Sequence, residues 1–170
     1  MHFEGSHVLA MQREELWEIL MDPDILARVT PGIKRLELID GTRYQAVSEI
    51  KMGPVNGAFK GNLEILDQNQ PESFSLKIKM NSRIGNVSAL GHINLKALNP
   101  HGTEISFAGD AKLSGTLART GQRVLTGVAN SMTKQFFKAL EKEIAGPGEE
   151  RKKGLFARFR KKDKTDPDGS

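Results

Sequence analysis

Apolar and polar residues alternate along much of the first 113 residues, a pattern typical of strands with one buried and one solvated face. The cleanest alternation is "FSLKIKM" at 74–80. Similar stretches, separated by short turns and weakest in the first case, run over 2–9, 33–40, 43–52, 57–67, 87–98 and 103–113. Consecutive strands joined by short turns predict an antiparallel meander.

Helical spacing replaces this alternation twice after the first strand. From Arg13 to Leu20 the apolar residues fall on one side of a predicted helix. Asp22 and Pro23 then supply an N-cap and a first-turn proline for a second short helix, which the Thr-Pro-Gly at 30–32 must end.

A long apolar stripe at helical spacing follows the last strand. From Gly115 to about Ala145 it predicts one continuous helix, roughly 45 Å long. The Gly-Pro-Gly at 146–148 ends this helix and marks a domain boundary. The stripe comprises Leu117, Gly121, Val124, Leu125, Val128, Ala129, Met132, Phe136, Leu140 and Ile144.

This order of elements predicts an α+β fold. A six- to seven-stranded antiparallel sheet must cover its apolar face, and the long C-terminal helix is the available cover. A sheet curved around such a helix, with two short helices after the first strand, is the helix-grip arrangement, which often leaves a cavity. We expect residues 1–146 to form this domain. Residues 147–170 form a basic amphipathic tail, either disordered in isolation or helical at a surface.

Composition excludes several kinds of chemistry. The chain has no cysteine, which removes disulfides, thiolate nucleophiles and Cys-held metal centres. Its four histidines lack metal-ligand spacing, and no paired-carboxylate motif accompanies them. We therefore expect no catalytic residue, no metal and no covalently bound cofactor. The N-terminal residues lack the pattern of a secretory signal, and no apolar run is long enough to span a membrane, so a cytoplasmic location is expected.

The positive net charge belongs mainly to the tail. Residues 1–146 hold 17 Lys or Arg against 16 Asp or Glu, whereas residues 147–170 hold 8 against 5. A nearly neutral body without a basic stripe argues against a nucleic-acid partner.

The tail contains "RKKGLFARFRKK" at 151–162, with seven basic residues and three large apolar ones. As a helix it would place the three apolar side chains on one face, so we predict weak, salt-sensitive binding to an anionic membrane. A solvated extension and a docking peptide for an acidic enzyme surface remain alternatives. The predicted membrane-binding residues are Arg151, Lys152, Lys153, Leu155, Phe156, Arg158, Phe159, Arg160, Lys161 and Lys162.

The apolar faces of the sheet and the long helix suggest a ligand cavity, although the same pattern is expected of a filled core. Gly121 would destabilise a helix, which is explained either by close contact with the sheet or by room left for a flat ligand. Gly53, Gly57 and Gly61 favour a bend or bulge in the sheet over a ligand contact. The predicted ligand-binding residues, whose sheet members depend on register, are Phe59, Leu76, Ile78, Met80, Phe107, Leu117, Gly121, Leu125, Val128 and Met132.

Three segments, "DPDILARVTPGIKRLEL", "KMGPVNGAFKGNLEI" and "GDAKLSGTLARTGQRVLTGVANSMTKQFFKALEKEI", resemble the accessory G subunit family of carbon monoxide dehydrogenase, within the START-like (SRPBCC) superfamily. The resemblance covers residues 1 to about 145. It is most specific at Gly115, Ala118, Gly121 and Phe136-Phe137, which match a Gly–Ala–Gly–aromatic pattern. Where many relatives carry a cysteine before Pro-Gly, this chain has Val29-Thr30, which argues against a thiol-based role there.

The resemblance implies a non-catalytic protein that binds a lipid or an isoprenoid quinone, either menaquinone or ubiquinone, and takes part in electron transfer. It would link a molybdenum-hydroxylase-type dehydrogenase, similar to CO dehydrogenase, to the inner face of the cell membrane as a peripheral protein. One alternative is a ligand-free adaptor that recruits such an enzyme or assists its assembly. Another is an enzyme, since some START-like proteins are cyclases or hydrolases, but no acid–base constellation supports it.

Overall fold

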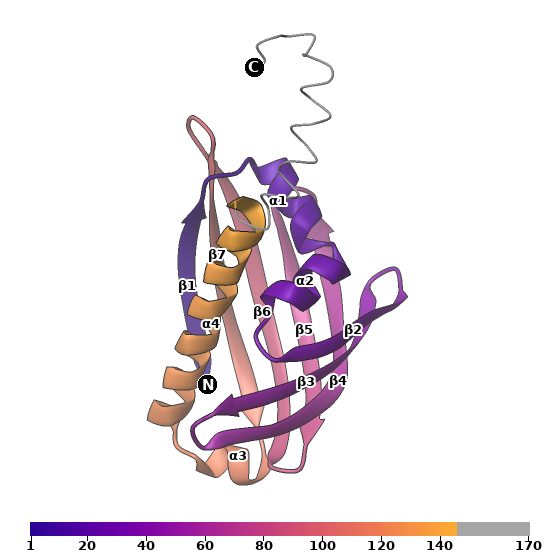
Figure 1. The fold of residues 1–170 in the computed structure, drawn as a ribbon, viewed down its shortest axis with the longest axis vertical. Coiled ribbons are helices and arrows are strands. Elements are labelled where there is room, and N and C mark those ends of the chain that lie inside the picture. Colours follow the sequence, from indigo (N-terminus) through magenta and orange to yellow (C-terminus); the bar gives the residue numbers. More distant parts are fainter. Residues whose placement is uncertain (146–170) are drawn as a thin grey trace.

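The computed structural model describes residues 1–145, which form one seven-stranded antiparallel sheet and four helices (Figure 1). The strands are β1 (His2–Leu9), β2 (Ile33–Asp40), β3 (Arg43–Met52), β4 (Val55–Asn69), β5 (Ser73–Ser82), β6 (Gly85–Leu98) and β7 (Gly102–Leu113). The helices are α1 (Arg13–Leu20), α2 (Pro23–Val29), α3 (Gly115–Arg119) and α4 (Gln122–Ala145).

The strands from β2 to β7 pair with their neighbours in chain order, and β1 adds to the free side of β7. The sheet order is therefore β1-β7-β6-β5-β4-β3-β2, with β1 and β2 as the two edges. The sheet curves so that α1, α2 and α4 lie on its concave side, with α1 and α3 at opposite ends (Figure 1). The predicted helix-grip fold is confirmed.

The short helices start as the sequence predicts. The Asp22 carboxylate accepts hydrogen bonds from the backbone N–H groups of Asp24 (2.9 Å) and Ile25 (3.4 Å), and Pro23 occupies the first helical position. This N-cap satisfies donors that the first turn of a helix cannot pair internally.

The prediction of one continuous C-terminal helix is wrong. The helix breaks between α3 and α4, where Gly121 has a φ of +104°, in a region that side chains with a Cβ rarely enter. A new helix then begins, with the Leu125 N–H donating to the Gly121 carbonyl at 3.1 Å. At 24 residues, α4 is about 36 Å long.

The apolar core is divided into two clusters along the concave face. The first, here called the α1 cluster, comprises the buried residues Leu9, Leu16, Trp17, Ile19, Leu20, Ile25, Val29, Tyr44, Ile65, Phe74, Leu95, Ile105, Phe137 and Leu140. The second, the α3 cluster, comprises the buried residues Ala46, Ile50, Val55, Phe59, Met80, Leu117 and Leu125. The buried apolar residues therefore gather in two groups, and the half-buried Leu36 and Leu63 pack against both of them.

One ion pair fastens the C-terminal part of α4 to α2. Arg28 donates from Nε and Nη2 to the two carboxylate oxygens of Glu143, at 3.2 and 2.6 Å. The Glu143 side chain is only 8% exposed, so Arg28 supplies the hydrogen bonds that water would otherwise make.

The close approach of β5 to β4 accounts for Gly61, one of the three glycines for which a bend or bulge was predicted. A Cβ at Gly61 would overlap the carbonyl oxygen of Lys79 on β5. The register with β3 and β5 is unbroken at Gly61, so no bulge occurs there, and the close approach of β5 is the reason for this glycine.

Candidate functional site

The five strand residues predicted to line a cavity all lie on the concave face. Register pairs Met80 with Gly61, Ile78 with Leu63 and Leu76 with Ile65, and directly paired residues share a face of the sheet. Phe59 and Phe107 occupy the same face of β4 and β7.

The structure brings seven of the ten predicted residues together. Phe59, Met80, Leu117 and Leu125 are buried members of the α3 cluster, and the half-buried Ile78, Val128 and Met132 pack against it. Leu76 and Phe107 pack instead against the α1 cluster.

Gly121 lies apart from this set and is exposed. A Cβ added there would meet nothing within 4 Å, so close contact with the sheet does not explain this glycine. Its backbone conformation explains it. The ligand-binding role of all ten predicted residues stays a prediction.

The concave face between the two clusters is incompletely covered. Leu63, Leu76, Ile78, Ile93 and Phe107 are only half-buried although they face the helix side of the sheet. Small residues lie beside them, with Ala89 paired to Ile78 and Gly91 paired to Leu76. Apolar surface that α4 does not cover therefore lies in the middle of the domain.

A groove of about 740 Å³ runs between the edge strand β1 and α4. Its β1 side is residues 4–7 and its floor includes Phe107 and Phe137. Its α4 side is formed by Gly127, Asn130, Ser131, Thr133, Lys134, Lys138 and Glu141. Sequence reasoning missed this groove, although one residue that lines it, Phe107, belongs to the predicted ligand-binding set.

His7 is the central polar group of the groove. Its ring stacks on Phe137, with centroids 4.6 Å apart and planes 14° apart, and Phe137 lies 6.3 Å from Phe107. His7 Nε2 lies 2.7 Å from a carboxylate oxygen of Glu141. A side chain from β1 is thereby fixed to two residues of α4.

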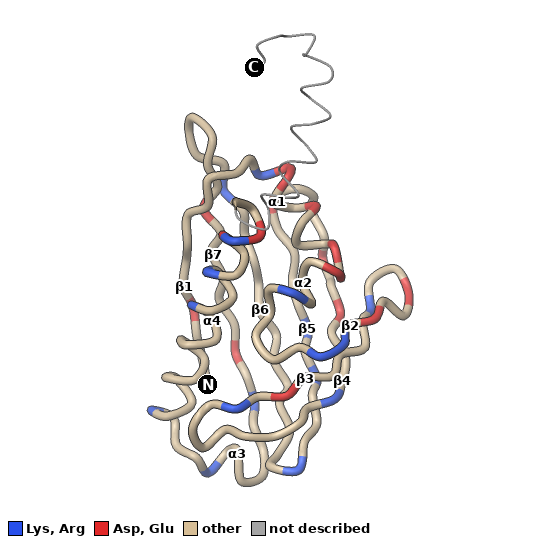
Figure 2. Tube along the Cα trace, viewed as in Figure 1, with Lys and Arg blue, Asp and Glu red and all other residues tan. Residues whose placement is uncertain are grey.

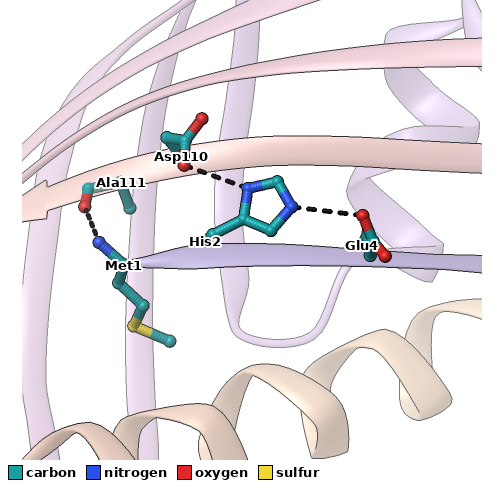
Figure 3. Close-up of polar contacts among 5 residues, drawn as sticks. All are labelled: Met1, His2, Glu4, Asp110 and Ala111. Atoms are coloured by element: carbon teal, nitrogen blue, oxygen red, sulfur yellow. Dashed lines mark hydrogen bonds and ion pairs between the residues drawn. The ribbon is translucent and has the colours of Figure 1, made fainter.

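A second histidine cluster lies on the opposite, convex face (Figure 3). His2 Nδ1 lies 3.0 Å from Asp110 and Nε2 lies 3.2 Å from Glu4. Hydrogen bonding to Glu4, and then to Asp110, raises the pKa of His2. The nearby Met1 ammonium donates to the Ala111 carbonyl at 2.9 Å and extends the pairing of β1 with β7.

Neither histidine cluster forms a metal site. Within residues 1–145, no group of three or more His, Cys, Asp or Glu side chains is arranged to hold a metal ion.

A smaller hollow of about 320 Å³ on the convex face has a charged lining that includes Arg43, Glu64, Lys77 and Lys79, and does not suit an apolar ligand. In the same part of the chain, no helix has the length and apolar content to span a membrane.

Comparison with known proteins gives the family. The family model for the G subunit of carbon monoxide dehydrogenase (CoxG) matches residues 5–145. The chain belongs to the CoxG family. A conserved protein from Geobacillus kaustophilus is 36% identical, with a TM-score of 0.83 over 85% of this chain and 95% of that one. No curated protein matches this chain.

More distant structures share the fold. A START superfamily protein from Mycobacterium smegmatis is 13% identical, with a TM-score of 0.65 over 84% of this chain and 95% of that one. The Zhui aromatase/cyclase from Streptomyces sp. R1128 is also 13% identical, with a TM-score of 0.65 over 87% and 98% of the two chains. The predicted family and START-like fold of this CoxG chain are thus confirmed. All ten predicted membrane-binding residues, and the boundary at residue 146, lie outside the described residues.

Proposed function

We propose that this CoxG-family protein is a non-catalytic carrier that binds an isoprenoid quinone or a lipid between the sheet and α4. It would connect a dehydrogenase of the CO dehydrogenase type with the membrane. The observation that carries the proposal is the half-covered middle of the concave face, where Leu63, Ile78 and Met132 retain exposed apolar surface beneath a helix.

A hydrophobic ligand would stabilise this arrangement. Each square ångström of apolar surface removed from water contributes about 25 cal/mol, and both the protein surface and a polyprenyl or acyl chain would be covered together. Met52, Met80 and Met132 all belong to or pack against the α3 cluster. Methionine side chains are flexible and polarisable, so they can adapt to a chain-like ligand.

The interior offers little support for catalysis. Of the buried polar side chains in residues 1–145, Glu143 is held by Arg28, and Thr103 donates to the Met11 carbonyl at 2.7 Å. The third, Ser48, sits opposite Phe59 in the sheet. A nucleophile needs a base within hydrogen-bond reach, and the apolar neighbours of Ser48 in the α3 cluster supply none.

The charge of the described body is uneven even though its sum is small, with mainly basic residues at the α3 end and both signs at the α1 end (Figure 2). The α1 end carries Glu14, Glu15, Glu18, Asp22 and Asp24. The end at which β3, β5 and β7 finish carries Lys51, Arg83, Lys112, Arg119 and Arg123. Bases near an anionic bilayer contribute about 1 kcal/mol each, so we propose that the α3 end faces the membrane and that the tail at 151–162 adds to the attraction.

Ligand binding is tested with the full chain, purified without delipidation from cells that make both menaquinone and ubiquinone. Native mass spectrometry and solvent extraction should find a quinone or lipid at close to one molecule per chain. A protein that repeatedly emerges without either, and takes up neither when mixed with quinone-containing vesicles, would instead be the ligand-free adaptor.

Membrane binding is tested separately by flotation with vesicles of anionic and neutral lipid. Deletion of residues 149–170 and the pair Arg119→Glu/Arg123→Glu should each weaken binding to anionic vesicles. The pair Lys77→Glu/Lys79→Glu makes the same charge change on the convex face and is the matched control. Equal flotation of all variants would refute the membrane proposal.

A further inference from the structure

The strand β2 is an open edge of the sheet. It pairs with β3 on one side, and no strand of residues 1–145 pairs with it on the other. The helix α2 buries Ile25 in the α1 cluster, which also contains Tyr44 of β3, so α2 lies over the sheet and inward of this edge. The turn that joins β2 to β3 projects from the side of the domain (Figure 1).

Apolar side chains are exposed along this edge. Leu38 and Ile39 are 51% and 54% exposed, and they are two of the five large apolar residues exposed in the part of the chain that the structure describes. An edge strand with exposed apolar side chains and free backbone groups is a template for pairing with another strand.

The hydrogen bonds of β3 show which backbone groups of β2 are free. The Glu49 N–H donates to the Gly32 carbonyl at 2.8 Å, so the odd-numbered residues of β3 bond to β2. The pairs of Arg35 with Val47 and of Glu37 with Gln45 are therefore hydrogen-bonded pairs. Alternation then turns the N–H and C=O groups of residues 36 and 38 away from β3, toward the open side.

The charges of β2 change sign along the strand. Lys34 and Arg35 stand near its start, and Glu37 and Asp40 follow toward its end. Within residues 1–145, neither Arg35 nor Glu37 takes part in an ion pair. Opposite charges on directly opposed residues stabilise an antiparallel pair of strands. A strand that is basic at one end and acidic at the other is therefore complementary to an antiparallel copy of itself.

We propose that β2 pairs in antiparallel direction with β2 of a second copy of this chain, with the two-fold axis at Leu36. In this register Arg35 of each copy lies opposite Glu37 of the other. The backbone phase fits, because Leu36 turns its N–H and C=O groups outward in both copies and can exchange hydrogen bonds with its counterpart. The neighbouring register of the same phase, with Leu36 opposite Leu38, would oppose the two Glu37 carboxylates and is disfavoured.

The contact is short and closes at two copies. Pairing shifts with β3 between Ile33 and Arg35, and between Leu38 and Asp40, restrict the regular part of β2 to residues 35–38. A two-fold contact uses the same strand of both copies, so no free β2 edge remains for a third. Because the interface is small, we expect a weak, reversible dimer with a dissociation constant on the order of 0.1 mM. This inference does not depend on the proposed carrier function.

The test reverses one charge of the strand at a time and measures self-association of the full chain by sedimentation equilibrium. Arg35→Glu turns both ion pairs into pairs of carboxylates, and Glu37→Arg turns both into pairs of guanidinium groups. Each variant should weaken self-association by about tenfold or more. Both side chains are exposed, so the variants should keep the wild-type circular dichroism spectrum. Lys77→Glu makes the charge change of Arg35→Glu at an exposed position of β5 and should leave the dimer unchanged.

An equimolar mixture of the two variants is the decisive sample. Every contact between Arg35→Glu and Glu37→Arg opposes a carboxylate to a guanidinium group, so the mixture should dimerise with about wild-type affinity although neither variant does so alone. Single variants that dimerise as well as the wild type, or a mixture that does not recover, would overturn the proposal. A wild type that stays monomeric at about 1 mM would also overturn it, and would leave this edge to a strand of another protein.

Discussion

Truncating one apolar residue in the middle of α4 and one near its C-terminal end distinguishes a filled core from a hollow one. Leu140 is 0% exposed within the α1 cluster, whereas Met132 is half-buried beside the α3 cluster. Leu140→Ala removes fully packed atoms and leaves a cavity, which should cost about 3 kcal/mol of unfolding free energy. Full burial of a methionine is worth roughly 1.5–3 kcal/mol, so half-burial of Met132 predicts a loss of about 1 kcal/mol in the ligand-free protein.

The assay is urea unfolding of the delipidated full chain, followed by fluorescence. Trp17 is the only tryptophan, is 2% exposed and lies edge-on to Phe74 at 5.5 Å, so its emission reports the loss of the α1 cluster. We expect Leu140→Ala to lower the unfolding free energy by about 2 kcal/mol more than Met132→Ala does. Equal losses would mean that the middle of α4 packs on a filled core, which would refute the argument for a ligand cavity.

Three further predictions concern single contacts. Arg28→Ala should lower the free energy of unfolding, measured in urea, by about 1–3 kcal/mol, because it leaves the 8% exposed Glu143 carboxylate unpaired. The same substitution should cost less in a Glu143→Gln background, and an equal cost in both backgrounds would contradict the ion pair. Gly127→Ala should raise stability by about 1 kcal/mol, and a destabilised variant would show that the space beside it is not open. His2 should titrate by NMR above the ordinary histidine pKa of about 6.5, and Glu4→Gln should lower its midpoint. The stability that protonated His2 contributes is fully present below its pKa in the unfolded chain and is lost as pH rises through its raised pKa in the folded chain. A titration midpoint of His2 at or below the ordinary histidine pKa would contradict the hydrogen bonds.

The strands could be predicted because their alternation is a local property of the sequence. The predicted ranges 33–40 and 43–52 coincide with β2 and β3, and Ile78 and Met80 face the concave side as their spacing requires. Alternation assigns a face of the sheet without fixing a position along that face. It could not show that Leu76 belongs with the α1 cluster while Ile78 belongs with the α3 cluster.

The break in the C-terminal helix left no trace in the apolar pattern. Leu117 and Leu125 are both buried in the α3 cluster on either side of Gly121, and their separation of about two helical turns keeps the stripe in phase across the interruption. The positive φ of Gly121 is the local cause, and a glycine in an otherwise helical pattern does not by itself reveal its φ.

The β1–α4 groove depends on contacts between segments more than 120 residues apart. Gly5 reads as part of a weak strand and Gly127 as a defect in a helix, and neither indicates the other. Only the folded chain brings them to the two sides of Phe107 and Phe137. Such sites arise from tertiary packing, which a one-dimensional pattern does not encode.

The central claim, that a hydrophobic ligand lies between the sheet and α4, is tested most directly by NMR of the methionine methyl groups. Met52, Met80 and Met132 lie in or against the α3 cluster, whereas Met11 and Met21 pack against the α1 cluster. Titrating the delipidated full chain with a short-chain quinone should shift the first three signals in a saturable manner and leave Met11 and Met21 nearly unchanged. Shifts confined to Met11 and Met21, or no saturable shift at any methionine, would contradict the claim.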